Sequence, residues 1–369
     1  MKRLINLLLL SCFLFGFSNS TSGNESFVLK RGINIAHWLS QSAARGKERD
    51  EFFTEKDVKY IASLGFDHIR IPIDEEQMFD EAGNKEPEAF ALLHRAIKQS
   101  LQENLRVIVD LHILRSHHFN TEDNPLFFKA SAQEAFYECW RKLSAELRKY
   151  PTNMVAYELM NEPVANDPED WNLIAYTCYL EVRDREPERV VVIGSNRWQS
   201  HETVKDLKVP EGDRNIIISF HYYLPFLLTH YKASWTSQKD YQGPVHYPGI
   251  TVNKDEFEAS CPEGLKESLR WNTRSSYDAA RLKRDFQEVV NVAKRYGLQV
   301  YCGEYGCMKN APEGDRLRWH RDMEQIFDEM GIARSLWCYR ENAVGFGILK
   351  INTPDEPMIE AMGLNKMKD

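Results

Sequence analysis

Val155-Ala156-Tyr157-Glu158-Leu159-Met160, followed by Asn161-Glu162-Pro163, is the stretch from which the fold can be read. An apolar run with β-branched and aromatic residues that stops at a proline is typical of a parallel strand buried on both faces. Glu162 then lies at the carboxyl end of that strand, where α/β barrels place their chemistry. Asn and Pro also punctuate ordinary turns, so the tripeptide alone fits a surface loop equally well.

Similar apolar runs recur along the chain on both sides of residues 156–160. They cover residues 32–35, 69–72, 107–112, 190–194, 216–221, 300–304 and 335–338. Amphipathic segments typical of helices lie between them, at residues 55–64, 88–104, 132–150, 168–185, 277–296 and 315–330. Eight strand–helix repeats predict a single-domain (β/α)8 TIM barrel. An open doubly wound sheet is the alternative, although no G-x-G-x-x-G follows an early strand.

The connection after the sixth apolar run is unusually long. It extends from Phe226 to Ser275 and is rich in aromatic residues and prolines, including Trp235 and Trp271. Loops of this length in a compact domain are usually functional. We therefore expect this loop on the carboxyl face of the barrel, beside the active site.

The amino-terminal residues are typical of an export signal. A basic start, Met1-Lys2-Arg3, precedes an apolar stretch from Leu4 to Phe17 and the small residues Ser18-Asn19-Ser20. We predict a signal peptide at residues 1–20, a polar segment at 21–30 and the catalytic domain at 31–369, hence a periplasmic or extracellular protein. A single membrane anchor at this stretch is one alternative. Leu9 to Cys12 also resembles a lipoprotein box, so a lipid anchor at Cys12 is another.

Composition excludes several classes of protein. The 369 residues carry a net charge of −8 with scattered Lys and Arg, which argues against nucleic-acid binding. The seven cysteines form no C-x-x-C pair, so we expect buried free thiols and neither a zinc site nor a disulfide framework. Nothing indicates a protein partner.

Polar residues gather at the ends of the predicted strands. In chain order they are Arg70, His112, Asn161-Glu162, His221-Tyr222-Tyr223, Glu304 and Trp337. Polar groups in apolar strands are costly unless they have partners, so their collection at one end of a barrel indicates a site. Two carboxylates, Glu162 and Glu304, without a metal motif beside them suggest glycoside hydrolysis, in which one protonates the leaving oxygen and the other attacks or activates water.

This ordered set resembles glycoside hydrolase family 5, the cellulase-like family with acids on strands 4 and 7, over nearly all of residues 31–369. The resemblance implies that Glu162 is the general acid/base and Glu304 the nucleophile of a retaining enzyme, with their carboxyl groups about 5–5.5 Å apart. It implies no cofactor and no metal. The resemblance also implies that Asn161 binds the sugar 2-hydroxyl, that Tyr223 hydrogen-bonds the nucleophile and that Arg70 keeps the nucleophile ionised. His112 and His221 would orient the site, and Trp337 would form the floor under the −1 sugar.

Several other residues have two interpretations. Trp38, Trp198, Trp235 and Trp271 could stack on sugar faces or pack in the core, while the helical Trp140 and Trp319 are expected in the core. Asp110, His112, His117 and His118 could be read as a metal cluster, but the first strand lacks the H-x-H of metal-dependent barrel hydrolases. Asp74-Glu75-Glu76 is expected to be a solvated loop.

The substrate expected from the resemblance is a β-linked glucan cleaved as by a cellulase or endo-β-glucanase. A β-1,3-glucan cleaved from its end, xyloglucan and β-mannan are alternatives that use the same residues. A transglycosylase would also use them while excluding water. A barrel that binds glycan without cleaving it belongs to another class, and it predicts a missing acid, whereas every expected position is filled.

Overall fold

The computed structural model describes residues 26–341, 345–350 and 352–365. The predicted signal peptide and Cys12 lie outside the described residues. Within the described ranges, no helix has the length and apolar character needed to cross a membrane.

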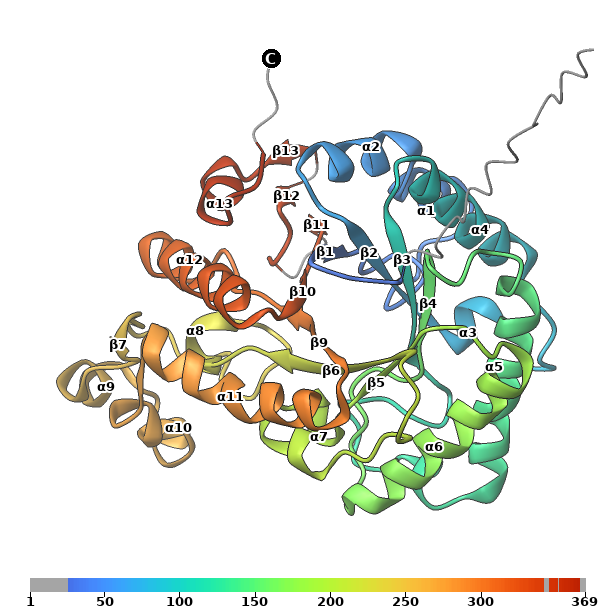
Figure 1. Ribbon diagram of the computed structural model, residues 1–369. Coiled ribbons are helices and arrows are strands. Elements are labelled where there is room, and N and C mark those ends of the chain that lie inside the picture. Colours follow the sequence, from blue (N-terminus) through green and yellow to red (C-terminus); the bar gives the residue numbers. More distant parts are fainter. Residues whose placement is uncertain (1–25, 342–344, 351, 366–369) are drawn as a thin grey trace, which may run out of the picture.

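Eight parallel strands of the described chain close into a barrel in the order β1–β10–β9–β6–β5–β4–β3–β2 (Figure 1). Their bounds are β1 Arg31–Asn34, β2 His68–Asp74, β3 Arg106–Ile113, β4 Val155–Glu158, β5 Val191–Gly194, β6 Ile216–Tyr222, β9 Gln299–Tyr305 and β10 Ala333–Leu336. Each strand overlaps one of the predicted runs, so the predicted TIM barrel is confirmed. Its register pairs Asn34 with Arg70 and His221 with Glu304, which brings the polar strand ends to one level.

Helices surround the barrel on its outer face (Figure 1). Those predicted from the sequence are present as α2 Glu55–Ser63, α4 Pro87–Gln102, α5 Ala130–Leu147, α6 Pro168–Arg185, α11 Ala279–Tyr296 and α12 Glu313–Met330. Shorter helices that were not predicted are α1 Lys47–Phe52, α3 Glu75–Met78, η1 Pro125–Phe127, α7 Asn196–Gln199, η2 His201–Asp206 and α13 Glu356–Ala361. A helix of one or two turns is too short to give an amphipathic period.

Short elements complete the carboxyl-terminal part. A small sheet consists of β11 Arg340–Glu341, β12 Leu349–Lys350 and β13 Thr353–Pro354, and it precedes α13. Arg316 of α12 donates to the Asp355 carboxylate at the start of α13, at 3.0 Å from Nη1 to Oδ2. This ion pair, on two nearly buried side chains, holds the last helix against the barrel.

The long connection after β6 is a folded insertion rather than an irregular loop. It contains α8 Phe226–Thr229, β7 Gly249–Ile250, α9 Lys254–Ser260, α10 Glu263–Leu269, η3 Arg270–Thr273 and β8 Ser276–Tyr277, with β7 and β8 antiparallel. Buried Tyr247 anchors it to α12 by donating to Asp322 Oδ2 at 2.7 Å. The Thr229 carbonyl accepts from Met308 N, which fixes α8 beside the loop after β9.

The barrel interior is apolar at its amino end and polar at its carboxyl end. Ile108, Ala156, Val192, Ile217 and Tyr301 form an inner cluster, which Phe27 and Leu29 close from below. Leu29 exchanges hydrogen bonds with the side chain of Gln299 at the start of β9. The segment 21–30, expected to be polar, therefore includes residues that plug the barrel.

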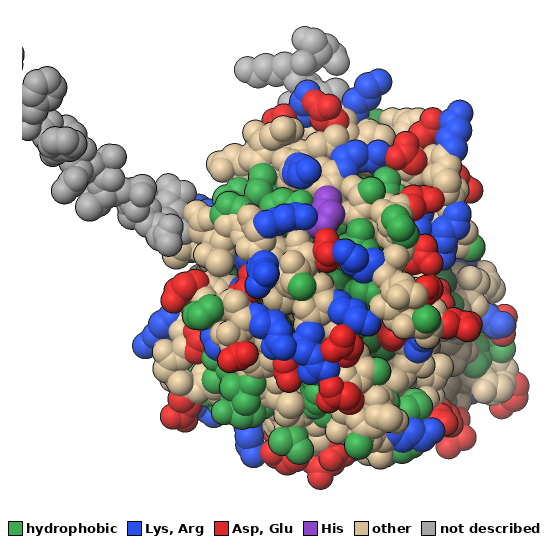
Figure 2. Space-filling model, turned by 90° about the vertical axis from the view of Figure 1, so that its right-hand side faces the viewer, with side chains coloured by type: hydrophobic (Ala, Val, Ile, Leu, Met, Phe, Trp, Pro, Cys, Tyr) green, Lys and Arg blue, Asp and Glu red, His purple; other side chains and the backbone are tan. Residues whose placement is uncertain are grey.

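Trp140 and Trp319 lie fully buried between helices and strands, as expected. The six cysteines of the described ranges are buried and form no disulfide with one another, which confirms that prediction for all but Cys12. Acidic and basic side chains are interspersed over the face shown in Figure 2, without a single-sign patch.

Candidate active site

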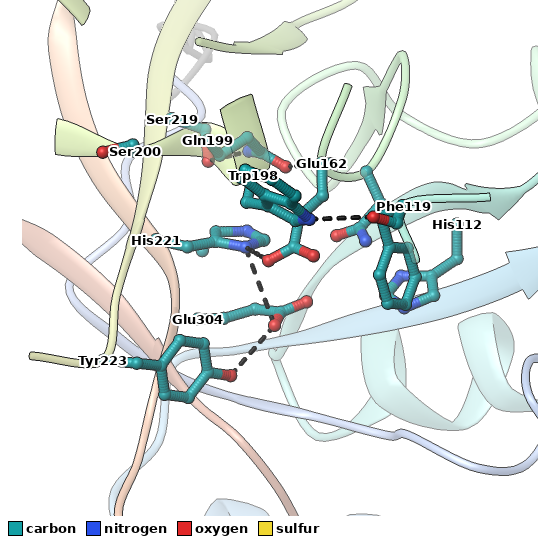
Figure 3. A network of polar contacts seen from close by, with 12 residues as sticks. His112, Phe119, Glu162, Trp198, Gln199, Ser200, Ser219, His221, Tyr223 and Glu304 are labelled. Atoms are coloured by element: carbon teal, nitrogen blue, oxygen red, sulfur yellow. Dashed lines mark hydrogen bonds and ion pairs between the residues drawn. The ribbon is translucent and has the colours of Figure 1, made fainter. Parts of the chain in front are cut away.

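Glu162 and Glu304 face each other at the carboxyl end of the barrel, one just after β4 and the other on β9 (Figure 3). Their nearest carboxyl oxygens, together with His221 Nδ1, all lie within 4.8 Å of one another. His221 Nδ1 is 2.9 Å from Glu162 Oε1 and 3.6 Å from Glu304 Oε2. An approach this close fits the carboxyl separation of roughly 5–5.5 Å in retaining glycosidases and not the about 6.5–9.5 Å of inverting enzymes, in which a water lies between the carboxyls.

Arg70 is the cation on which the site is built. Its fully buried guanidinium lies 2.8 Å from Glu304 Oε1, 2.7 Å from Glu158 Oε2 and 3.1 Å from Asp110 Oδ2. It also donates to the amide oxygens of Asn34 and Asn161, at 3.0 and 2.9 Å. A buried charge is tolerated when it is paired and hydrogen-bonded on all sides, and Arg70 meets that condition.

Two of these partners were not identified as site residues from the sequence. Glu158 was read only as part of a buried strand, and Asp110 only as a member of the metal alternative. Both side chains are fully buried, and their strands pair them directly, Asp110 with Glu158. An acidic residue inside an apolar strand requires a buried cation as its partner. This requirement could have predicted from the sequence that Asp110 and Glu158 pair with Arg70.

Glu162 and Glu304 have different surroundings. Burial raises the pKa of Glu162 well above its ordinary value, and the neighbouring Glu304 charge adds to that rise. Burial also raises the pKa of Glu304, but Arg70 and the hydroxyl of Tyr223, which donates to Glu304 Oε2 at 3.0 Å, oppose it. Of the pair, Glu304 ionises first and Glu162 keeps its proton, which is the division that general acid catalysis needs.

The histidines of the site are neutral. Burial lowers the pKa of His112 to about 3 and holds the pKa of His221 well below its ordinary value. His112 Nδ1 lies 2.7 Å from Asp110 Oδ2, which fixes the ring orientation. The His112 ring stacks on Trp337, with ring centroids 5.7 Å apart and planes 9° apart. Trp337 directly follows β10, and its stacking on His112 fixes the indole ring at one side of the site.

Of the four candidate stacking tryptophans, Trp198 and Trp235 are exposed near the site, and Trp271 is exposed on η3 of the insertion. Trp198 is 48% exposed and lies beside Glu162, with its Nε1 donating to the Phe119 carbonyl at 2.8 Å (Figure 3). Trp235, on the insertion, is 47% exposed and contacts Phe346, which packs on Tyr223. Both tryptophans present apolar faces to solvent.

The expectation for Trp38 was wrong. Trp38 is 1% exposed, packs on Phe53 and donates from Nε1 to the Arg49 carbonyl at 2.8 Å. His37 instead lies against Trp337, with ring centroids 5.9 Å apart. The backbone of His37 has φ 58°, a left-handed conformation that sends successive side chains in directions a regular strand would not give.

Asp74 was also wrongly expected in a solvated loop. It ends β2, is 2% exposed and accepts a hydrogen bond from Gln41 N at 2.7 Å. Burial raises its pKa to about 7.

Metal-ligand spacing occurs at one place in the described ranges. The group is Glu162, His221 and Glu304, that is, the candidate catalytic pair and the histidine beside it. Asp110, His112, His117 and His118 do not form such a group among the described residues.

The sequence profile described as cellulase (glycosyl hydrolase family 5) matches residues 31–343, most of the chain. The chain belongs to glycosyl hydrolase family 5. Endoglucanase C of Acetivibrio thermocellus is 30% identical over 320 residues, covering 85% of this chain and 91% of that protein. Cellodextrinase A of Ruminococcus flavefaciens is 29% identical, covering 84% and 85%. A solved structure of a hyperthermophilic endo-β-1,4-glucanase with substrate superposes with a TM-score of 0.72 at 25% identity, covering 91% and 97%.

Within this family 5 barrel, the structure assembles the residues that the sequence placed at strand ends. Arg70, His112, Asn161, Glu162, His221, Tyr223, Glu304 and Trp337 all lie at the carboxyl end of the barrel, and the expected bonds from Arg70 and Tyr223 to Glu304 are present. The structure adds Asn34, Asp110, Glu158 and Gln199, whose side chains support this set.

Proposed function

We propose that this family 5 protein hydrolyses internal β-1,4 linkages of a glucan with retention of anomeric configuration. The observation that carries the proposal is the close approach of two carboxyls, within 4.8 Å, of which only Glu304 contacts the Arg70 guanidinium. The names of the relatives, an endoglucanase, a cellodextrinase and an endo-β-1,4-glucanase, support the substrate class and the internal mode of attack.

The first step forms a glycosyl-enzyme. A Glu304 carboxylate oxygen attacks the anomeric carbon, and the bond to the departing sugar oxygen breaks. Glu162 donates its proton to that oxygen as it leaves, so the aglycone departs as a neutral alcohol. Arg70 donates to the Asn161 amide oxygen, and among the described residues the Asn161 Nδ2 has no hydrogen-bond partner, so it is available to the 2-hydroxyl of the bound sugar.

The second step releases the sugar. Glu162, now ionised, removes a proton from a water that attacks the anomeric carbon from the side the aglycone left. The ester bond to Glu304 breaks, and its carboxylate returns to the hydrogen bonds from Arg70 and Tyr223. Two inversions at one carbon give net retention.

The cleft offers sugar-binding surfaces on both sides of the carboxyl pair. Trp337 forms the wall beside His112, Trp198 covers the Glu162 side, and Trp235 stands on the insertion. Aromatic faces suit the apolar C–H faces of pyranoses. We assign these tryptophans to substrate binding and the insertion to the choice among β-glycans.

A panel of soluble polysaccharides tests the proposal. Carboxymethylcellulose, barley mixed-linkage glucan, laminarin, xyloglucan and mannan are incubated with the wild type and with Glu304→Gln, and products are separated by chromatography. We expect a rapid fall in the viscosity of carboxymethylcellulose and β-configured products in the first NMR spectra. Products from none of these substrates would refute the enzymatic proposal, and transfer products in place of free sugars would indicate a transglycosylase.

We propose that the protein acts outside the cytoplasm, on the basis of the signal-like residues 1–20. Expression of the full chain followed by mass measurement of the exported protein tests this. Cleavage after residue 20 is expected, whereas a lipid-modified Cys12 at the new amino terminus would support the anchored alternative. An uncleaved cytoplasmic chain would refute export.

A further inference from the structure

Three consecutive residues after β5 adopt left-handed backbone conformations. Arg197, Trp198 and Gln199 have φ of 53°, 60° and 50°. None is a glycine, and such conformations persist in non-glycine residues only where the surroundings impose them. We call residues 196–199 the β5 clasp. Its backbone turns Trp198 outward into the cleft and Gln199 inward, where Gln199 is fully buried (Figure 3).

The β5 clasp is bonded to the segment that carries the acid/base. Asn196 exchanges two hydrogen bonds with the backbone of Ala165, each 2.9 Å long. The Trp198 amide donates to the Pro163 carbonyl, and the Glu162 amide donates to Gln199 Oε1 at 2.9 Å. Residues 162–165 are thus fastened to a neighbouring strand end along their length.

Glu162 needs such support because its own backbone is strained. Its φ is 45°, in the left-handed region that a glutamate rarely adopts. The preceding residue, Asn161, still bonds to β3 through its amide, which donates to the Leu111 carbonyl. The chain therefore leaves the sheet at Glu162, and the bond from its amide to Gln199 fixes the direction in which the carboxyl points.

The amide nitrogen of Gln199 is linked to Glu304 through two intermediate residues, Glu158 and Arg70. Gln199 Nε2 donates to Glu158 Oε1 at 3.2 Å and to Ser219 Oγ at 3.0 Å. Glu158 binds Arg70, and Arg70 binds Glu304. Gly194 makes room for this amide, because a Cβ at that position would lie 2.3 Å from Gln199 Nε2.

We propose that Gln199 is a positioning residue for the acid/base, holding the Glu162 backbone in register with the network that holds Glu304. The inference rests on the proposed function and adds a residue to it. Gln199 touches no reacting atom in this arrangement. It sets the distance from the Glu162 carboxyl to the leaving oxygen, while Glu304 keeps its own bonds to Arg70 and Tyr223 when Gln199 is changed.

The consequence is a selective defect. Gln199→Met preserves length and volume and removes the acceptor for the Glu162 amide, so the strained backbone is free to relax. Misplacement of a catalytic group by about 1 Å costs about 10²-fold in rate. In kcat/KM, which covers the steps up to formation of the glycosyl-enzyme, that loss falls only on substrates whose leaving group needs a proton from Glu162, because an activated leaving group departs without one.

The test compares two aryl β-cellobiosides, one with a phenyl and one with a dinitrophenyl leaving group. For Gln199→Met we expect kcat/KM to fall about 10²-fold on the phenyl substrate and to stay close to the wild-type value on the dinitrophenyl substrate. Gln299→Met is the matched control, because Gln299, like Gln199, accepts a hydrogen bond from a backbone amide but lies at the opposite end of the barrel. Its two rates should both match the wild type.

Gly194→Ala displaces the same amide from the other side and should give the same selective loss, which covers the case in which Gln199→Met does not fold. Equal losses on both substrates, or no loss on the phenyl substrate, would overturn the positioning role. If the wild type still cleaves both substrates in that case, the proposed function is unaffected. Wild-type protein that cleaves neither substrate would overturn the proposed function and the positioning role with it.

Discussion

Tyr223→Phe removes the hydrogen bond that the Tyr223 hydroxyl donates to Glu304 and keeps the aromatic ring. The hydroxyl donates to Glu304 Oε2 at 3.0 Å, and burial holds the pKa of Tyr223 well above its ordinary value, so it remains a donor at every working pH. A hydrogen bond to a charged group is worth about 1.5–3 kcal/mol, and one pKa unit corresponds to about 1.36 kcal/mol. Loss of the bond should therefore raise the pKa of Glu304 by about one to two units.

The direction of the pKa change depends on which protonation state of Glu304 the hydrogen bond stabilises. The hydroxyl stabilises the carboxylate, so its removal makes Glu304 harder to ionise and moves the acidic limb of kcat/KM to higher pH. The pH profile on dinitrophenyl β-cellobioside measures this limb, which belongs to the free enzyme and to the coupled pair. Tyr222→Phe is the control, since the neighbouring hydroxyl donates to Asp285 of α11 at 2.7 Å. An acidic limb that stays in place in Tyr223→Phe would refute this account of Glu304.

Three further predictions concern the surrounding residues. Arg70→Met leaves buried carboxyls without their cation and should lower the free energy of unfolding by about 3–5 kcal/mol, measured in urea, while abolishing turnover; an unchanged unfolding midpoint would contradict it. Asp74→Asn should stabilise the protein at pH 8 and have little effect at pH 4, because a carboxyl whose folded pKa of about 7 exceeds its unfolded value loses stability as pH rises between the two; equal effects at both pH values would contradict it. Trp198→Ala should raise KM for cello-oligosaccharides by about 2- to 12-fold, for an aromatic contact of roughly 0.5–1.5 kcal/mol, whereas Trp271→Ala on η3, at similar exposure, should not.

The barrel and its catalytic pair could be predicted from the sequence because both depend on regular geometry. Apolar runs of strand length alternate with amphipathic segments, and parallel strands bring their carboxyl ends together. Arg70, His112 and Glu304 could be recognised because each is a polar residue in an otherwise apolar run. The long-range pairing of Glu162 with Glu304 then follows from barrel closure.

The features that could not be predicted depend on irregular backbone. His37 and not Trp38 lies against Trp337, and the backbone of His37 is left-handed. Gln199 reaches Glu162 only through three left-handed residues. The sequence Arg197-Trp198-Gln199 has no glycine to signal such a turn. The helices of the insertion after β6 are too short to give a periodic pattern in the sequence, so its secondary structure could not be predicted either.

Covalent trapping of the nucleophile tests the central claim most directly. The wild type is incubated with dinitrophenyl 2-deoxy-2-fluoro-β-cellobioside, which forms the glycosyl-enzyme and releases it slowly, and the intact mass and the labelled peptide are measured. We predict a single 2-fluorocellobiosyl adduct on Glu304, and none on Glu304→Gln. A wild type that releases dinitrophenol without forming an adduct, or an adduct on any other residue, would contradict double displacement through Glu304.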